Sequence, residues 1–238
     1  MKIILSPSKT FHKDLLQSDD IPYFKSDANR LIKMLKKVSP EVIQSSMKLS
    51  DALLDDVVKM IHDYDQFTSP AIYTYHGQAF KMFDVMSLSE SDLKFMQDHL
   101  LIISGLYGLL KPFDGITLYR LEMQDQTITN LYAYWRPKIE KYLNTYCQHE
   151  MIINLASEEY SKVIPTSFKM ITIDFMEMKQ GKAKRISMNI KAMRGLFARY
   201  LIQHRIETLD DLKKITINDY HFDQTSSTQH TLVFKKEV

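Results

Sequence analysis

The chain has 238 residues, of which 45% are hydrophobic, 25% are charged and one is a cysteine, and its formal net charge at pH 7 is +2. This composition excludes a disordered protein and an internal disulfide, and it supplies enough apolar side chains for a substantial core. No stretch approaches the roughly 18 to 20 apolar residues that span a bilayer, so we expect no membrane segment.

The first predicted element is a buried strand at residues 2–5. Its few apolar residues are too few for a secretory signal, so we expect a cytoplasmic protein. Polar groups at the carboxyl end of a buried strand commonly face a ligand crevice in α/β sheets, which makes Ser6 and Lys9 candidate site residues. The pair also matches the Ser-x-x-Lys motif of penicillin-binding enzymes, but the companion motifs of those enzymes are missing.

Apolar residues recur at helical spacing in several later segments, which we predict to be helices that pack on the core. The predicted helices span residues 27–38, 40–47, 51–61, 89–100, 131–146, 191–201 and 209–215. Pro137 lies inside the fifth of these segments, where it either kinks the helix or marks its start.

Residues 102–123, IISGLYGLLKPFDGITLYRLEM, hold three of the six glycines. Gly105 and Gly108 predict a tight turn or a close approach of the backbone to another group, which glycine allows. Ser104 and Tyr107 accompany these glycines, so all four are candidate crevice residues. The Gly105-x-x-Gly108 turn also resembles the hairpin of helix-hairpin-helix DNA binders, in which amides face a phosphate.

A turn at Asp114-Gly115 leads into residues 116–123, which have the pattern of a strand. Arg120 and Glu122 in this segment are candidate catalytic residues. The structural alternative is a packed connector followed by a strand whose charged residues face water, and spacing alone favours that alternative.

A second apolar run, residues 151–157, predicts another buried strand with polar residues at its end. Asn154 and Ser157 are candidate crevice residues there, and Tyr160 is a candidate catalytic residue. The two strand ends and the central glycine stretch can converge on one crevice. Such a crevice offers the acids, bases and cations of a nucleotide-directed enzyme, although no phosphate-loop or dinucleotide glycine pattern is present.

Residues 168–178 and 182–190 alternate like strands, and the turn at 179–182, which contains Gly181, predicts an antiparallel hairpin. A last strand is predicted at residues 231–236. An antiparallel pair beside more buried strands gives a mixed sheet. We therefore predict an α+β (mixed α/β) fold with a mixed sheet flanked by helices, forming a single compact domain over residues 1–238.

The basic charge is concentrated in one segment. Between Met178 and Ile206 there are eight lysines or arginines and no acid, which leaves 23 basic against 29 acidic residues elsewhere. Such asymmetry indicates a polyanionic partner, and its structural alternative is a solvated basic face.

The eight histidines do not form a metal-binding pattern along the chain. None has a glutamate three residues before it, no two are three to five residues apart, and there is no cysteine pair. We therefore predict no metal site and no cofactor, except where folding brings carboxylates together.

Six short blocks, distributed over almost the whole chain, form a recognisable series. They are LSPSKT at residues 5–10, SGLYGLLKPFD and YRLEM in the central stretch, INLASEEY at 153–160, IKAMRGLFARY at 190–200, and His221-Phe222-Asp223 with Ser226-Ser227. In their sequence and order these blocks resemble the signature of the YaaA family of bacterial peroxide stress proteins.

The resemblance implies a YaaA-type fold, a role in the response to hydrogen peroxide, DNA binding, and protection through a low level of free iron. Together with the basic segment, it leads us to expect non-sequence-specific binding to double-stranded or distorted DNA by a monomer. The residues expected to contact DNA are Lys179, Lys182, Lys184, Arg185, Lys191, Arg194 and Arg199. The rival interpretation is an enzyme acting on a nucleotide or nucleobase at Lys9, Arg120 and Glu122; of the two, we favour a non-enzymatic role.

Overall fold

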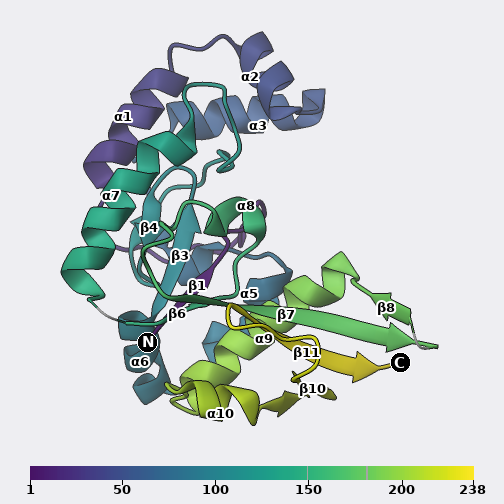
Figure 1. Cartoon of the computed structure of the whole chain (residues 1–238). Helices are drawn as coiled ribbons and strands as arrows, with labels where there is room; N and C mark the ends of the chain where they lie inside the picture. The colour runs from purple at the N-terminus through teal and green to yellow at the C-terminus, as the bar shows by residue number, and fades with distance from the viewer. Residues whose placement is uncertain (149, 181) are drawn as a thin grey trace.

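A mixed sheet runs through the molecule in the strand order β4-β3-β1-β6-β7-β11-β10-β9, with β8 paired to β7 (Figure 1). The structure is a computed structural model that describes residues 1–148, 150–180 and 182–238. The strands are β1 (Lys2–Leu5), β3 (Leu100–Ser104), β4 (Gly108–Leu110), β6 (Ile152–Asn154), β7 (Met170–Lys179), β8 (Lys182–Lys184), β9 (Thr216–Ile217), β10 (Tyr220–Asp223) and β11 (Thr231–Glu237). A separate antiparallel pair joins β2 (Ser69–Pro70) to β5 (Gly115–Ile116).

The central strands β3, β1, β6, β7 and β11 are parallel, whereas β4, β10 and β9 pair in antiparallel fashion. β1 and β3 are buried along almost their whole length, as expected for parallel strands that are covered on both faces. The carboxyl ends of β3, β1 and β6 therefore meet at one edge of the sheet. The predicted fold class, a mixed sheet flanked by helices, is confirmed.

Helices flank the sheet in two groups: α1, α3 and α7 lie together on one side, and α9 and α10 lie beside the β7 and β11 part (Figure 1). The helices are α1 (Lys25–Leu35), α2 (Pro40–Met47), α3 (Asp51–His62), α4 (Ala71–Thr74), α5 (Gln78–Phe83), the 3-10 turn η1 (Val85–Ser87), α6 (Glu90–His99), α7 (Leu131–Tyr146), α8 (Glu158–Ser161), α9 (Ser187–Gln203) and α10 (Leu209–Lys213). Within the described ranges, no helix has both the length and the hydrophobicity needed to cross a membrane.

α9 joins the β7 and β11 part of the sheet to the rest of the molecule. A Cβ at Gly195 would overlap the carbonyl oxygen of Ala79, so glycine permits α9 to approach α5 this closely. On α9, the ring of Phe197 also packs against Phe175 of β7 and Phe234 of β11, with centroids 5.6 and 4.9 Å apart. α9 therefore contacts α5 as well as the strands β7 and β11.

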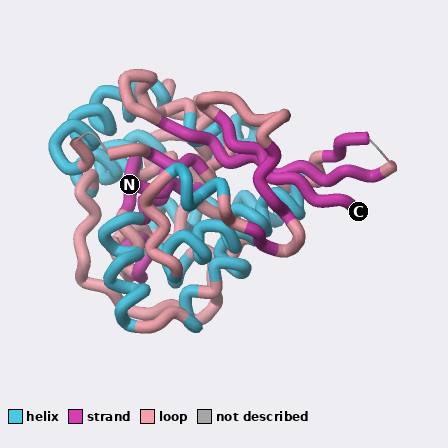
Figure 2. Tube along the Cα trace, turned by 60° about the horizontal axis from the view of Figure 1, so that its bottom comes forward, coloured by secondary structure: helices cyan, strands magenta, loops and turns pink. Residues whose placement is uncertain are grey.

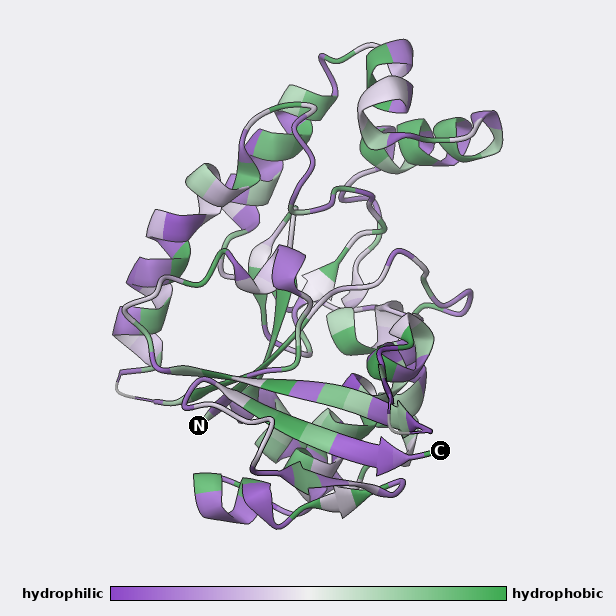
Figure 3. Ribbon diagram, turned by 45° about the vertical axis from the view of Figure 1, so that its right-hand side comes forward, coloured by the Kyte–Doolittle hydropathy of each residue, from purple (hydrophilic) through white to green (hydrophobic). Residues whose placement is uncertain are grey.

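The far ends of β7, β8 and β11 project from the body as an arm that reaches the C terminus (Figures 1 and 2). We define the arm as residues 176–180, 182–184 and 235–237. Burial along β7 alternates up to Phe175 and declines beyond it. The end of β11 is charged, and Figure 3 shows it as hydrophilic. The arm is therefore a polar projection and not a part of the core.

The predicted strand at residues 182–190 is wrong beyond Lys184, because α9 begins at Ser187 and not at Lys191. The helix starts early since Ile190 continues the inward stripe of Met193 and Phe197, and helical spacing places all three against the core. Gly181, in the predicted hairpin turn, lies outside the described residues.

The predicted strand at residues 116–123 is also wrong, since only Gly115–Ile116 forms a short strand and residues 117–123 form none. β3 is paired on both sides, with β4 and with β1, so this segment cannot join it. It packs instead across the glycine turn, where the backbone of Leu121 lies against Gly105.

Candidate functional site

The polar residues that follow β1 and β6 contact each other at the carboxyl edge of the sheet. The backbone N–H of Ser157 donates to Oγ of Ser6 at 2.8 Å, and the two hydroxyl oxygens are 3.3 Å apart. Both side chains are partly exposed. Since β1 and β6 are parallel neighbours, residues 151 positions apart meet here, at the edge where α/β sheets commonly bind ligands.

A cavity of 740 Å³ opens beside these strand ends and is lined by Lys9, Arg120 and Glu122. Nζ of Lys9 lies 2.6 Å from Oε1 of Glu122, and Nη2 of Arg120 lies 3.9 Å from the same oxygen. The other lining residues are Ser46, Met47, Lys48, Gln124, Asp125 and Gln126. The lining therefore carries three cations and two carboxylates, a balance that favours an anionic ligand.

Two residues of α8 lie next to this cluster. Burial raises the pKa of the Glu159 carboxyl, the hydrogen bond from the backbone N–H of Gln124 opposes the rise, and the charge of Glu122 adds to it. A carboxyl with a raised pKa beside a second carboxyl has the properties of a general acid or base. Burial raises the pKa of Tyr160 far above its ordinary value, so its hydroxyl stays protonated at neutral pH and can only donate or accept hydrogen bonds.

The central glycine turn lies inside the protein, behind the cavity. Oγ of Ser104 accepts hydrogen bonds from the backbone N–H groups of Leu106 and Tyr107 at 3.2 and 2.9 Å. These amides are buried and already bonded, so the expectation that this turn presents amides to a phosphate is wrong. Gly105 leaves room for the carbonyl oxygen of Leu121 and so fixes the path of the segment that carries Arg120 and Glu122.

Two further predicted crevice residues, Gly108 and Asn154, are also buried. Gly108 has φ +70°, a conformation that favours glycine, and it packs against the ring of Trp135. Nδ2 of Asn154 donates to Oγ1 of Thr172 at 3.1 Å, and its Oδ1 accepts from the backbone N–H of Ala156 at 2.9 Å. Both residues shape the strand ends and do not line the cavity.

The residues predicted to contact DNA fall into two groups. The first group is exposed, and Arg185 in it pairs with Asp174 at 2.8 Å. The other members make no ion pair with any described residue; they are Lys179, Lys182, Lys184 and Lys191. Three of these lysines lie on the arm and the fourth on the first turns of α9.

The second group, Arg194 and Arg199, faces the body of the protein. Nη1 of Arg199 donates to the carbonyl oxygens of Phe83 and Asp84 at 2.9 and 2.7 Å, which ties α9 to the end of α5. Burial lowers the pKa of Arg194, and its Nε is buried without a partner in the part of the chain that is described. The fold therefore does not bring all seven cations onto one exposed surface.

Potential metal ligands are scattered. Within residues 1–148, 150–180 and 182–238, no group of three or more His, Cys, Asp or Glu side chains is arranged to hold a metal ion. The single cysteine, Cys147, is buried after α7, and burial raises the pKa of its thiol. A raised pKa disfavours the thiolate that a nucleophile or a metal ligand requires.

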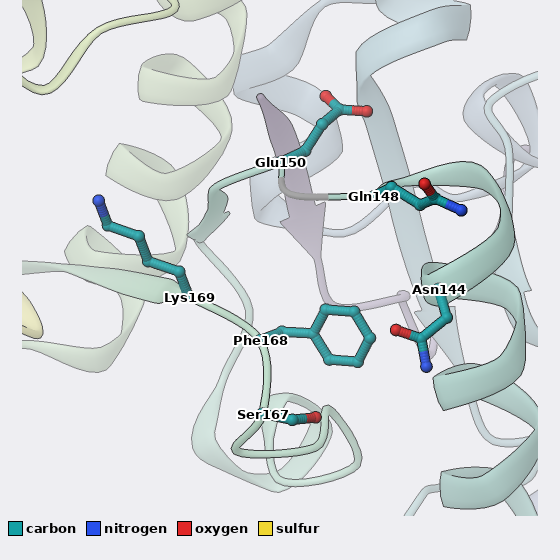
Figure 4. A pocket seen from close by; sticks show the side chains of 6 residues that line it. All are labelled: Asn144, Gln148, Glu150, Ser167, Phe168 and Lys169. Carbon is teal, nitrogen blue, oxygen red and sulfur yellow. The ribbon is translucent and has the colours of Figure 1, made fainter.

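A second cavity, of 580 Å³, lies at the amino-terminal edge of the same strands. Figure 4 shows its lining side chains, which come from the end of α7, the segment before β6 and the loop before β7. Glu150 in this lining pairs with the amino terminus of Met1 at 2.7 Å and with Lys2 at 3.2 Å. Its carboxylate is thus already neutralised, and the cavity at the carboxyl edge remains the stronger candidate.

Some residues of the candidate site were not expected from the sequence. Lys48 follows α2 in the left-handed conformation, and it reaches the cavity from a helix about 40 residues along the chain from Lys9. No local pattern links these two lysines, because only the fold brings the end of α2 to the cavity that Lys9 lines.

The fold and the cavity define an α/β protein with a charged crevice at the carboxyl ends of parallel strands and a basic arm that projects from the body. A family model described as "Peroxide stress protein YaaA" matches residues 1–226, so the chain belongs to the YaaA family.

The chain is also similar over nearly its full length to several curated bacterial proteins. It is 40% identical to a UPF0246 protein of Marinomonas sp. (strain MWYL1), with 98% of this chain and 96% of the relative covered. It is 36% identical to a UPF0246 protein of Fusobacterium nucleatum, covering 100% and 99% of the two chains. A UPF0246 protein of Francisella philomiragia is 34% identical, with 99% and 100% covered.

Proposed function

We propose that this YaaA-family protein acts in the cytoplasm in the response to hydrogen peroxide and limits damage to DNA by free iron. In this proposal the protein binds double-stranded or distorted DNA without sequence specificity. Binding uses the arm and the start of α9, where cations face solvent, and we expect no enzymatic step. The family match supports the peroxide context, and the DNA contact and the effect on iron are our inferences.

The observation that carries the DNA proposal is the set of exposed cations on a projecting element. The arm projects from the body (Figure 2). The five exposed cations on the arm and just beyond it are Lys179, Lys182, Lys184, Arg185 and Lys191. Each phosphate that a cation neutralises releases condensed counterions, which is the main driving force of non-specific binding. Five such contacts predict a slope of log affinity against log salt of about −4 to −5.

The proposal is tested by the affinity of the full chain for a short duplex over a salt series. The double variant Lys182→Ala with Lys184→Ala is expected to flatten the slope by about 2, because two phosphate contacts are lost. The matched control, Lys33→Ala with Lys37→Ala on and just after α1, removes the same charge from a helix far from the arm (Figure 1) and should leave the slope unchanged.

Equal effects of the two double variants would attribute binding to overall charge and overturn the role of the arm. No binding even at low salt would overturn the DNA proposal as a whole. A peroxide-sensitive deletion strain extends the test to cells: wild-type chain should restore survival in hydrogen peroxide, and the arm variant should not.

A second candidate function, an enzyme acting on a nucleotide or nucleobase, is favoured by one specific observation. The 740 Å³ cavity combines the Lys9–Glu122 ion pair with Arg120, and Glu159 lies beside it with a raised pKa. Cations that hold a phosphate and a carboxyl with a raised pKa that can exchange a proton are what hydrolysis or group transfer on a nucleotide requires.

The two candidates are distinguished by variants of the cavity. If the cavity binds nucleotides, a set of nucleoside mono-, di- and triphosphates should raise the melting temperature of the wild-type chain, and Lys9→Met should abolish the shift. The variant Glu122→Gln should then change nucleotide binding or turnover but leave the salt slope of duplex binding intact. No shift with any nucleotide would argue against this function.

A further inference from the structure

His12 and His76 lie side by side although 64 residues separate them in the chain. Nε2 of His12 and Nδ1 of His76 are 2.8 Å apart, and the two rings, with centroids 3.9 Å apart, are inclined at 65°. The prediction of no metal site rests on spacing along the sequence, so it does not reach a pair that only the fold brings together.

The backbone beneath this histidine pair is fixed on both sides. Phe11 and Tyr75 form an isolated antiparallel bridge. The N–H of His12 donates to the carbonyl oxygen of Thr74, and the N–H of His76 donates to that of Thr10, both at 2.9 Å. Two imidazoles on a fixed backbone lose little conformational freedom when they bind a common ion, and such preorganisation increases affinity.

The surroundings of the pair suit a hydrated cation. The two rings line a cavity of 460 Å³ that also contains the carboxylates of Asp14 and Asp84 and the amine of Lys81. The acids outnumber the lysine in this lining, so the local charge does not repel a cation.

We propose that His12 and His76 form a two-nitrogen site for a divalent transition-metal ion with tetragonal coordination, Cu²⁺ or Ni²⁺. If an ion lies about 2.0 Å from each of two nitrogens that are 2.8 Å apart, the nitrogen–ion–nitrogen angle is roughly 90°. This is the cis angle of tetragonal coordination. A tetrahedral Zn²⁺ site needs nitrogens about 3.3 Å apart, so the rings would have to separate to bind zinc.

Water completes the coordination, because no third His, Cys, Asp or Glu ligand joins the pair in the described part of the chain. Two imidazoles also exclude Mg²⁺ and Ca²⁺ as the preferred ions, since these ions select oxygen ligands. The expected site is therefore shallow, open to solvent on one side and selective for the ions at the top of the affinity order for nitrogen ligands.

The test is a calorimetric titration of the full chain, prepared without a histidine tag, with Ni²⁺ alone in a buffer that does not bind metals. We expect one ion per chain, at least tenfold weaker binding by His12→Ala and by His76→Ala, weaker binding of Zn²⁺ than of Ni²⁺, and none of Mg²⁺. With Cu²⁺, electron paramagnetic resonance should show coupling to two nitrogens in the wild-type chain. His62→Ala on α3 is the matched control and should leave the affinity unchanged.

The conservative variants His12→Asn and His76→Asn guard against a loss of binding through misfolding, and thermal unfolding confirms that each variant is folded. Absence of saturable Ni²⁺ binding by the wild-type chain would overturn the proposal. So would full retention of binding by a folded chain that carries both His12→Ala and His76→Ala. In either case the pair is a hydrogen-bonded contact and not a metal site.

Discussion

Asp114 is a buried carboxylate in the turn that follows β4. Its Oδ2 accepts a hydrogen bond from the backbone N–H of Lys111 at 2.9 Å. Burial raises its pKa from the ordinary 3.8 to about 6, the bond and the charge of Lys111 oppose the rise, and the charge of Asp20 adds to it. The folded state therefore holds the proton more tightly than the unfolded chain does. This contribution to stability is present below about pH 4 and is lost as the pH rises through 6, by up to about 3 kcal/mol.

We predict that Asp114→Asn increases the free energy of unfolding at pH 8 by about 1 to 3 kcal/mol and changes it little at pH 4. The amide keeps an oxygen acceptor for Lys111 but removes the buried charge. Urea unfolding at the two pH values measures the difference. The exposed Asp20→Asn serves as a control with a small effect at both. A change in stability of the same size at pH 4 and pH 8 would show that the charge of Asp114 is not the cause.

The sequence predicts which residues are chemically suited to a site better than it predicts where their side chains point. Lys9, Arg120 and Glu122 are candidates because they are polar groups near a strand end or the glycine turn, and these three side chains do line one cavity. Ser104 and Asn154 are candidates for the same reason, yet their side chains lie inside the protein and accept hydrogen bonds from backbone N–H groups at their own strand ends. The sequence does not reveal whether a polar group at a strand end turns toward solvent or toward the backbone beside it.

The packing of α9 on α5 gives a prediction at the scale of helices. A Cβ at Gly195 meets the backbone of Ala79, which cannot move aside, whereas a Cβ at Gly77 meets Oγ of Ser8 at 2.5 Å, and a serine side chain can rotate away. Alanine in a helix gains about 1 kcal/mol over glycine. Overpacking of a fixed contact costs about 1 to 3 kcal/mol or more. The clash should therefore outweigh the gain at Gly195.

We expect Gly195→Ala to lower the free energy of unfolding by at least about 2 kcal/mol, and Gly77→Ala, at the start of α5, to lower it by about 1 kcal/mol or less. Chemical denaturation of the two variants beside the wild-type chain measures both values. If Gly195→Ala proves neutral or stabilising, α5 and α9 are not held at the distance that the structure shows.

Element boundaries depend on contacts that are distant in the sequence. The predicted bounds of α2, α3 and α7 agree closely with the observed ones, because an apolar stripe at helical spacing is a local property. The start of α9 at Ser187 depends on the packing of Ile190 beside the sheet, and the absence of a strand at 117–123 depends on β4 occupying the edge of β3. In both cases tertiary packing overrides the local alternation that predicts a strand.

The strand order of the whole molecule could not be derived from the sequence. β11 is the last strand along the chain, yet in the sheet it lies between β7 and β10. Its position is set by its pairing with β7, about 60 residues earlier. Pairings of this range carry no local pattern. The expectation that all residues form one domain and unfold together stays a prediction. The fluorescence of the single tryptophan offers a direct way to test it.

Phe234 of β11 and Trp135 of α7 report on different parts of the molecule. Phe234 is fully buried among Phe175, Phe197 and Phe222, whereas Trp135 is buried against Gly108, and its Nε1 donates to the carbonyl oxygen of Gly105 at 2.8 Å. If the chain is one cooperative unit, a cavity made at one end destabilises the other end equally.

We predict that Phe234→Ala lowers the free energy of unfolding by about 3 to 5 kcal/mol. The urea midpoints from tryptophan fluorescence and from far-ultraviolet circular dichroism should move together, because both then report the same transition. Leu196→Ala, on a partly exposed position of α9, is the control and should move both midpoints only slightly. A fluorescence midpoint that stays in place while the dichroism midpoint falls would mean that the Trp135 part unfolds separately, and that the chain comprises two folding units joined through α9.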